Sequence, residues 1–596
     1  MSTMIATTSL LLLVLLPLLL ALALVFRRTQ AIALKLAPWA ALPVLLQVLF
    51  AAPGGSLQLP WLLIGSELGI GDETSRLFLL FTALLWWLAG LFARAYLAQQ
   101  PGRKSFFLYY LLAMTGNLGL ILAQDLGSFY VFFALMSFAA YGLVVHERTQ
   151  PAIYAGRIYI ILVVIGELAL FAAMVMAMSA TNAIGFDAVR AGLVQAESRD
   201  LIMLLALIGF GIKAGVLGLH VWLPLAHPVA PTPASAVLSG AMIKAGLLGW
   251  LRLLPLGETA LLQWGEVFMV LGLAAAFYGV VVGLTQREPK TLLAYSSISQ
   301  MGIMTMAVGL GLTAPDAYPE ILIVITLYAL HHGLNKGALF LGVGVIAACQ
   351  GVQRRWLWLA LWLPALAVAG APLTSGMLVK LMLKAQAANA PEPWSALLPV
   401  LLSVSALATT LLVGRFLLLL AKPKPSASEH GSAIGLIMPW ALLVVTALIL
   451  PWWFAPASAT TWQLTNIISS LWPILFGVAL ISAVLLWMRH RRRQAGMLSP
   501  QGHEYPDFVP RIPPGDLLIP LSHVFLFLYN FARCCSVEQL PRWRDTCLAA
   551  FTRPWSGMMR WYNRLGQIEA GLARWHNGLL LFVLLGLLLA LWSCHA

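Results

Sequence analysis

Long apolar segments recur from one end of this chain to the other, and they constrain its fold more than any other feature. Each is roughly 20 residues long, which is enough for an α-helix to cross the hydrocarbon core of a bilayer. Only 10% of the 596 residues are charged, whereas soluble domains carry about 25%. The sequence therefore predicts an all-α polytopic membrane protein that contacts the lipid bilayer.

Hydropathy predicts about sixteen transmembrane helices, and the charges of the loops between them predict a topology. Arg27, Arg148, Arg287 and the basic run at 489–493 fall in alternate loops, while the opposite loops hold residues such as Asp187. Basic loops face the cytoplasm. We therefore expect the N-terminus outside and residues 489–576 on the cytoplasmic side of a bacterial-type cytoplasmic (inner) membrane. Because the formal charge of +14 lies in these loops, and no basic patch interleaved with aromatic residues is present, we expect no nucleic-acid binding.

The segments group into regions along the chain. Residues 489–576 are polar and then amphipathic, with Trp and Arg at helical spacing, which indicates a lateral helix in the membrane interface. An ordinary amphipathic anchor is the alternative interpretation. The regions are N-terminal flanking helices at 1–104, a first repeat at 105–254, a second repeat at 262–420, flanking helices at 434–488, the lateral segment at 489–576, and a final transmembrane helix at 577–596.

Several ionisable residues lie in the middle of apolar segments, where a charge is costly and usually marks an ion path. One such residue alone is as readily a satisfied structural group, but a set spread over five segments favours a path. Tyr328, His332 and Lys336 recur every four residues and so share one helix face. The predicted ion-path residues are Glu167, Lys213, Lys244, His332, Lys336 and Lys380, with Asp125, His331 and His227 as further candidates.

Two of the predicted helices are interrupted. Prolines stand at 224, 228, 231 and 233, and Pro372 lies between small residues from Gly370 to Gly376. Proline removes a helical hydrogen bond, and broken helices at corresponding places in two halves are typical of inverted-repeat transporters. We therefore predict two inverted five-helix repeats. Two unrelated proline kinks are the alternative.

These residue types can move a proton. Burial disfavours the charged form of a lysine and a nearby carboxylate favours it, so movement of a carboxylate would switch a lysine between loading and release. Replacing Lys213 or Lys380 with alanine is then expected to abolish translocation. We find no haem, iron–sulfur or nucleotide-binding pattern and no metal-type cysteine spacing. The sequence predicts no cofactor, no metal site and no catalytic residue.

Four stretches identify a resemblance. FGIKAGVLGLHVWLPLAHPVAPTPASAVLSGAMIKAG closely resembles a signature of the proton-conducting antiporter-like subunits of respiratory complex I, Mrp-type cation/proton antiporters and formate-hydrogenlyase-type hydrogenases. GLTQREPKTLLAYSSISQMGI, LHHGLNKGALFLGVG and APLTSGMLVK resemble its other motifs. The resemblance covers roughly residues 60–420 and implies two inverted five-helix repeats. It implies that Lys213 is the central lysine of the first half, Lys244 the connecting lysine and Lys380 the terminal lysine, with His332 and Lys336 on the path.

Three positions depart from the family pattern. Ala134 stands where the family has a glutamate that pairs with the first lysine, and Glu167 is the nearest mid-membrane acid. Leu225 replaces an acid, and Tyr328 stands where a histidine is common.

The leading hypothesis is a subunit that translocates protons, or Na+ in exchange for protons, within a complex I-like, hydrogenase-like or Mrp-like assembly. Its partners would be other membrane and peripheral subunits, which would supply any redox chemistry. One alternative is a proton-conducting partner in an inorganic-carbon uptake complex. Another is a structural subunit with a degenerate channel, which the missing glutamate favours and the retained lysines oppose.

Overall fold

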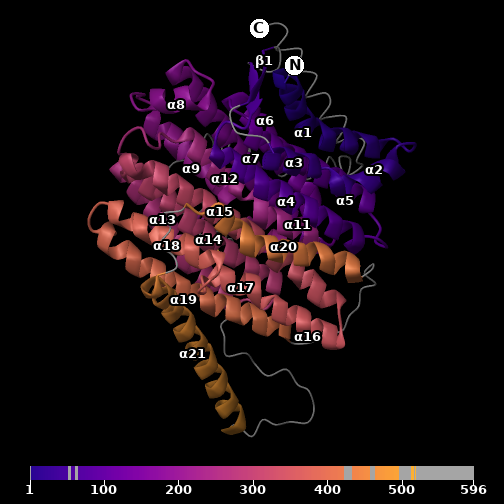
Figure 1. Ribbon diagram of the computed structural model, residues 1–596, viewed down its shortest axis with the longest axis vertical. Coiled ribbons are helices and arrows are strands. Elements are labelled where there is room, and N and C mark those ends of the chain that lie inside the picture. The colour runs from indigo at the N-terminus through magenta and orange to yellow at the C-terminus, as the bar shows by residue number, and fades with distance from the viewer. Residues whose placement is uncertain are drawn as a thin grey trace, which may run out of the picture. The chain divides into compact units, whose positions relative to one another are not determined.

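The computed structural model describes residues 2–50, 55–60, 65–421, 433–456, 463–494, 512–515 and 517, and α-helices account for most of them (Figure 1). Most of the predicted lateral segment at 489–576 and the predicted final span lie outside the described residues. The chain divides into two units, of which the first holds residues 1–58 and 67–514 and all of the side chains discussed below.

The helices of the N-terminal half carry the first interruption. They are α1 (Ser2–Val25), α2 (Gln30–Leu36), η1 (Ala37–Trp39), α3 (Leu42–Phe50), α4 (Glu73–Tyr96), α5 (Arg103–Leu122), α6 (Leu126–Val144), α7 (Gln150–Thr181), α8 (Phe186–Leu193), α9 (Arg199–Ala214), α10 (Trp222–Val229), α11 (Thr232–Val237), η2 (Leu238–Met242) and α12 (Lys244–Leu253). Two short strands, β1 (Ser56–Leu59) and β2 (Ser66–Gly69), pair between α3 and α4 and depart from the expected all-α fold.

The second interruption lies among the later helices. These are α13 (Leu262–Thr285), α14 (Pro289–Thr313), η3 (Pro315–Ala317), α15 (Tyr318–Ala348), α16 (Gly351–Ala360), α17 (Trp362–Ala369), α18 (Ser375–Gln386), η4 (Ala387–Asn389), α19 (Trp394–Ala421), α20 (Ala433–Trp453) and α21 (Leu464–Gln494). The helix breaks fall at 215–221 and 370–374. The first holds Gly215 and Gly218 but none of the predicted prolines, since Pro224 and Pro228 lie within α10, whereas the second holds Gly370 and Pro372.

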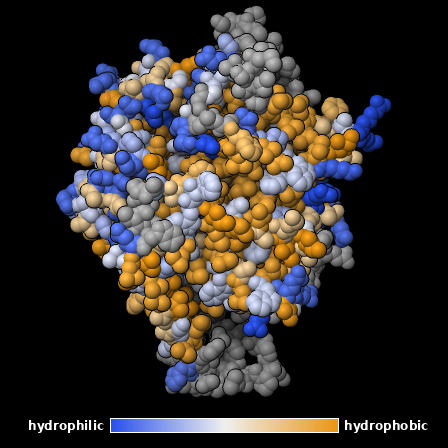
Figure 2. All heavy atoms as spheres, in the orientation of Figure 1, coloured by the Kyte–Doolittle hydropathy of each residue, from blue (hydrophilic) through white to orange (hydrophobic). Residues whose placement is uncertain are grey.

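Within the described residues, 10 helical segments are long and apolar enough to cross a membrane. Hydrophobic side chains cover the middle of the face drawn in Figure 2, and hydrophilic ones gather toward its edges. Large apolar side chains such as Leu168 and Phe171 on α7 and Met438 on α20 are exposed. Exposure of so many apolar groups is the property of a surface solvated by lipid. The chain is therefore a multi-pass membrane protein.

Local signals set where the helices begin. The Asp72 carboxylate accepts a hydrogen bond from the Ser75 N–H at 2.7 Å and caps α4. The Thr149 hydroxyl does the same for α7, where a proline follows in the first turn. These groups satisfy backbone donors that the first turn of a helix leaves free.

The helices α13 and α14 pack through glycines that face each other. A side chain on Gly272 would lie 2.5 Å from the Gly302 carbonyl, and one on Gly309 would lie 2.6 Å from the Gly265 carbonyl. Small residues allow backbones to approach closely, which is how helices associate in a bilayer. This close packing holds α14 against the rest of the second half.

Helix α15 is central to the second half. It contacts α4, α11, α14, α17, α18 and α20, and Figure 1 shows α20 running across it. All of its residues from Val324 to Leu341 are buried. Two of the predicted path residues, His332 and Lys336, and the further candidate His331 lie on this helix, so the fold places them among helices from both halves of the chain.

A buried arginine fixes the end of α5. Arg252, on α12, donates to the carbonyls of Leu120, Ile121 and Ala123 and to the Ser75 hydroxyl, at 2.9 Å for Leu120 and 3.1 Å for Ser75. The last carbonyls of a helix have no intrahelical partner. One guanidinium therefore satisfies several of them and ties α4, α5 and α12 together.

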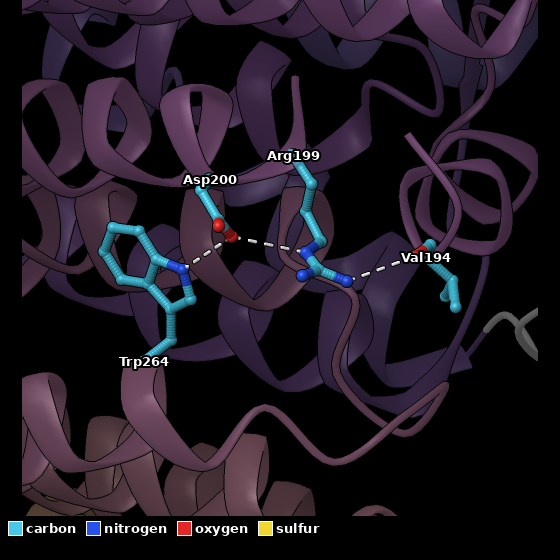
Figure 3. Close-up of polar contacts among 4 residues, drawn as sticks. All are labelled: Val194, Arg199, Asp200 and Trp264. Atoms are coloured by element: carbon cyan, nitrogen blue, oxygen red, sulfur yellow. Dashed lines mark hydrogen bonds and ion pairs between the residues drawn. The ribbon is translucent and has the colours of Figure 1, made fainter. Parts of the chain in front are cut away.

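The start of α9 is tied to α13 at the surface (Figure 3). The Asp200 carboxylate accepts hydrogen bonds from Trp264 Nε1 at 3.0 Å and Arg199 Nε at 3.3 Å, and Arg199 also donates to the Val194 carbonyl at 3.1 Å. The indole N–H, and secondly Arg199, hold the pKa of Asp200 below its usual value. These contacts fix one end of the helix that carries Lys213.

Candidate functional site

The structure buries five of the six residues predicted for the ion path. Glu167 is 5% exposed, Lys213 3% and Lys244 1%, and Lys336 and His332 are fully buried. Lys380 is half-buried. They form two groups, one around Lys213 in the first half and one from Lys244 to Lys380.

In the first group, Lys213 contacts a tyrosine. Its Nζ donates to the Tyr159 hydroxyl at 3.2 Å, and this hydroxyl donates to the Ser137 carbonyl at 2.8 Å. Glu167 lies on the same face of α7 as Tyr159, because the two are separated by twice the four-residue spacing. Glu167 and Lys213 act on each other electrostatically, but the ion pairs of the described residues do not include this pair. Among the residues that the structure describes, Glu167 Oε2 has no hydrogen-bond partner.

The position of the expected glutamate is occupied by a side chain that cannot pair with a lysine. Ala134 lies half-buried on α6, and the adjacent Phe133 ring lies 6.0 Å from Lys213 Nζ. The Tyr159 ring lies 5.7 Å from the same nitrogen. Aromatic rings attract a cation, so two rings and one hydroxyl surround Lys213.

Asp125 has a structural contact that its position in the sequence did not reveal. One carboxylate oxygen accepts from the Ser128 N–H at 2.7 Å, and the other accepts from the Glu67 N–H at 2.8 Å. It therefore caps α6 and holds the segment before α4. The structure does not bring Asp125 into contact with the predicted path residues.

The break between α9 and α10 follows Lys213 directly. Gly215 ends α9 with a φ of 78°, a left-handed conformation that glycine adopts without steric cost. The break leaves carbonyls without helical partners, and Trp222 Nε1 donates to one of them, that of Ile212, at 2.7 Å. The Trp222 ring also packs on Tyr159 at 5.0 Å between centroids. One indole thus satisfies the broken backbone and supports the partner of Lys213.

A π-helical turn, η2, positions Lys244. The Ile243 N–H bonds to the Leu238 carbonyl, five residues back, at 3.2 Å. The Ser239 carbonyl thereby loses its usual helical donor and accepts from Lys244 Nζ at 2.6 Å. Single π-turns are frequent at functional sites. The turn points the lysine back along its own helix toward α15, which contacts η2.

Two histidines and a lysine follow one another on α15. Lys336 Nζ donates to the Leu293 carbonyl at 3.1 Å, and His331 Nδ1 lies 2.8 Å from the Ser375 hydroxyl. His332 acts electrostatically with Lys244, Lys336 and His331. Within the described part of the chain, neither of its ring nitrogens has a hydrogen-bond partner. Buried polar groups are normally hydrogen-bonded, so an unsatisfied imidazole between two lysines is unusual.

Lys380 lies beside the second break. Its Nζ donates to the carbonyls of Val368 and Ala369, at 3.1 and 2.6 Å, where α17 ends. A positive charge is favourable at this end of a helix. Lys380 and Lys384 also line a cavity of about 40 Å³ whose wall includes Ser403, Ser469 and Ser470. His331, on α15, interacts electrostatically with Lys380, which lines this cavity.

The two groups are linked by backbone packing. Gly246, two residues after Lys244, faces α9, where a side chain would lie 2.9 Å from the Ala214 backbone nitrogen. No interaction joins Lys213 and Lys244 directly among those found in the described residues. The structure therefore brings Lys244, Lys336, His332, His331 and Lys380 together and keeps Lys213 and Glu167 apart from them.

Two further residues complete the second group. His227, a further candidate, is fully buried on α10 and acts electrostatically with Lys290, Lys336 and Lys244. Lys290 was not predicted, because in the sequence it belongs to a charged loop with Arg287. In the structure it is 9% exposed and donates to the Ala230 carbonyl at 2.7 Å. In the described part of the chain, no three His, Cys, Asp or Glu residues gather as they would around a metal ion.

This chain is thus a polytopic membrane protein whose interrupted helices carry buried basic residues. A structure of the Mrp complex from Dietzia sp. DQ12-45-1b shares the fold, with a TM-score of 0.66 and 21% identity over 91% of this chain and 61% of that chain. Residues 123–405 match the family described as NADH:quinone oxidoreductase/Mrp antiporter, TM. This region of the chain is therefore similar to that family.

Curated relatives match over part of their length. Hydrogenase-4 component B of Escherichia coli is 32% identical over 46% of this chain and 42% of its own length. The putative antiporter subunit mnhA2 of Staphylococcus saprophyticus is 32% identical over 55% of this chain and 44% of its own length. The chain thus aligns with less than half the length of these relatives.

Proposed function

We propose that this chain is a proton-translocating subunit of a larger membrane complex. One path would begin at Lys244, near the end of the first proposed repeat, and continue through Lys336, His332, His331 and Lys380 of the second half. The family match and the relatives, which include a hydrogenase component and an antiporter subunit, support this proposal. Na+ in exchange for protons is the alternative ion.

The arrangement of the buried bases carries the proposal. Each group from Lys244 to Lys380 acts electrostatically on the next, through Lys336, His332 and His331. Like charges in a low-dielectric interior repel strongly. The five residues together therefore hold fewer protons than they have sites. A proton added at one end of the set favours release of a proton from the other end. The unpaired ring nitrogens of His332 can accept and donate a proton in this sequence of transfers.

The proposal extends to the whole topology. We assign about sixteen spans, with two inverted repeats at 105–254 and 262–420 between flanking helices. Breaks at 215–221 and 370–374, one in each proposed repeat, support this assignment. Lys213 lies just before the first break and Lys380 just after the second. Each repeat would then supply one half-channel.

The location and partners follow from the same proposal. The N-terminus would lie outside a bacterial-type cytoplasmic membrane, and the loops that carry Arg148 and Arg287 would face the cytoplasm. Other membrane and peripheral subunits would supply the driving reaction, since the path residues are acids and bases without redox chemistry.

A second candidate is a subunit whose first half-channel is silent. The observation that favours it is the contact of Lys213, which bonds to a tyrosine hydroxyl and not to a carboxylate. A hydroxyl carries no charge to switch the lysine between loading and release. Ions would then pass only through the second half.

Proton flux through reconstituted vesicles tests both candidates. The full chain is purified with the subunits that copurify with it, and a potassium diffusion potential drives proton uptake. We expect Lys380→Met to lower flux roughly a hundredfold, as loss of a proton-transfer group does. The control is Lys35→Met on α2, an exposed lysine. Unchanged flux in Lys380→Met would refute the proposal, and unchanged flux in Lys213→Met alone would identify the silent first half.

A further inference from the structure

Lys290 occupies an unexpected place in the fold. It lies in the first turn of α14 and is 9% exposed, although the sequence around it, Gln-Arg-Glu-Pro-Lys, is that of a polar loop. Its Nζ donates to the Ala230 carbonyl at 2.7 Å, in the turn between α10 and α11. The lysine therefore contacts the turn between α10 and α11, which follows the first break.

Lys290 interacts electrostatically with acidic residues near the surface. Glu147, in the loop between α6 and α7, and Glu288, just before α14, are exposed, and both act electrostatically on Lys290. Carboxylates at the mouth of a buried site raise the local concentration of cations, including protons. We call Glu147 and Glu288 together the acidic mouth.

Lys290 also interacts electrostatically with a buried base, His227. His227 acts electrostatically with Lys290, Lys336 and Lys244. Neither ring nitrogen of His227 has a hydrogen-bond partner among the described residues, and the ring is stacked on Phe340 at 4.6 Å between centroids. Phe340 fixes the plane of the imidazole, so its two nitrogens keep their directions. His227 can both accept and donate a proton, and it thus interacts electrostatically with Lys290 and with the path residues Lys336 and Lys244.

We propose that Lys290 is the proton inlet of the second half, loading from the acidic mouth and passing protons to His227. This rests on the function proposed above. A hydronium ion at the acidic mouth gives a proton to the neutral Lys290 amine and becomes water, and the ammonium passes the proton through bridging water to one nitrogen of His227. The imidazolium then releases the proton from its other nitrogen to Lys336 or Lys244. Each donor ends neutral, so charge and protons balance at every step.

The inlet role and a purely structural role make different demands on the side chain. Ala230 follows the last turn of α10, and any cation that donates a hydrogen bond there stabilises the helix end. An inlet must also release its proton. Arginine keeps its proton in proteins, whereas a buried lysine can lose it. Lys290→Arg therefore preserves the structural role and removes the proposed one.

The test compares proton flux in vesicles that contain the full chain with its copurifying subunits. We expect Lys290→Arg to lower flux roughly a hundredfold while subunit content and thermal midpoint stay those of the wild type. Lys35→Arg, at an exposed lysine, is the matched control. Flux of Lys290→Arg within twofold of the wild type would overturn the inlet.

Chemical rescue keeps the test decisive if Lys290→Arg assembles poorly. In Lys290→Ala, we expect ethylamine to restore flux, with a rate that follows the pKa of the added amine. Tetramethylammonium, a cation without a proton to give, should restore none. Equal rescue by both, or rescue by neither, would contradict the inlet.

The two proposals fail in different ways. Loss of flux in Lys380→Met with normal flux in Lys290→Arg would overturn the inlet and leave the path. Normal flux in both, or no flux in the wild type, would overturn the proposed function itself.

Discussion

A single methyl group at the second helix break should disturb Lys380. Gly370 ends α17 with a φ of 91°, and a side chain added there would lie 2.8 Å from Lys380 Cδ and 3.1 Å from its Nζ. The lysine would have to move away from the two carbonyls that it caps. Gly370→Ala therefore perturbs the proposed terminal residue of the path without altering any ionisable group.

The structure gives the size of this effect in two parts. A left-handed conformation costs an alanine about 1–2 kcal/mol. Losing one charge-assisted hydrogen bond from Lys380 adds about 1.5–3 kcal/mol. The free energy of unfolding should therefore fall by about 2.5–5 kcal/mol.

Gly218 offers a matched control at the first break. Its φ is 88°, and a side chain there would meet nothing within 4 Å. Gly218→Ala should show the backbone cost of about 1–2 kcal/mol alone. Denaturant titration in mixed micelles measures both variants, and vesicle flux shows whether Lys380 has moved. Equal destabilisation and equal flux in the two variants would refute the reasoning.

Three further predictions concern stability. Arg252→Met leaves the last carbonyls of α5 without a donor and should cost about 3–5 kcal/mol of unfolding free energy, while Arg252→Lys should lose less; denaturant titration of both checks this. Trp222→Phe removes the donor to the Ile212 carbonyl and should cost about 1–3 kcal/mol, and a neutral result would contradict the role of the indole. Burial, and then the charge of Arg148, lower the pKa of His146 to about 4. The unfolded chain then binds a proton below pH 6.5 that the folded chain does not. The thermal midpoint should fall as the pH is lowered from 7 to 5, and His146→Gln should weaken this dependence on pH.

The buried charges show how far sequence reasoning reached. A lysine in an apolar membrane helix is costly to expose to lipid and therefore faces the interior of the helix bundle. For this reason Lys213, Lys244 and Lys336 were predicted to be buried, as they are. The two helix breaks were predicted because proline and glycine act on the backbone locally. Neither inference required knowledge of tertiary contacts.

Other residues could be understood only from their neighbours. Asp125 caps α6 and holds another segment, which depends on a backbone N–H 58 positions away in sequence. Lys290 has the local sequence of a loop charge and becomes buried because the α10–α11 turn covers it. The tyrosine that contacts Lys213 comes from α7, 54 residues earlier. No local pattern indicates such pairs.

The sequence by itself determined that this chain is a helical membrane protein, where its helices are interrupted and which ionisable residues lie in apolar surroundings. These properties depend on hydropathy and backbone chemistry, which act over a few helical turns. Only the tertiary structure decided which buried groups face one another. That placement depends on helices far apart in sequence, and it separates Lys213 and Tyr159 from the bases that surround His332.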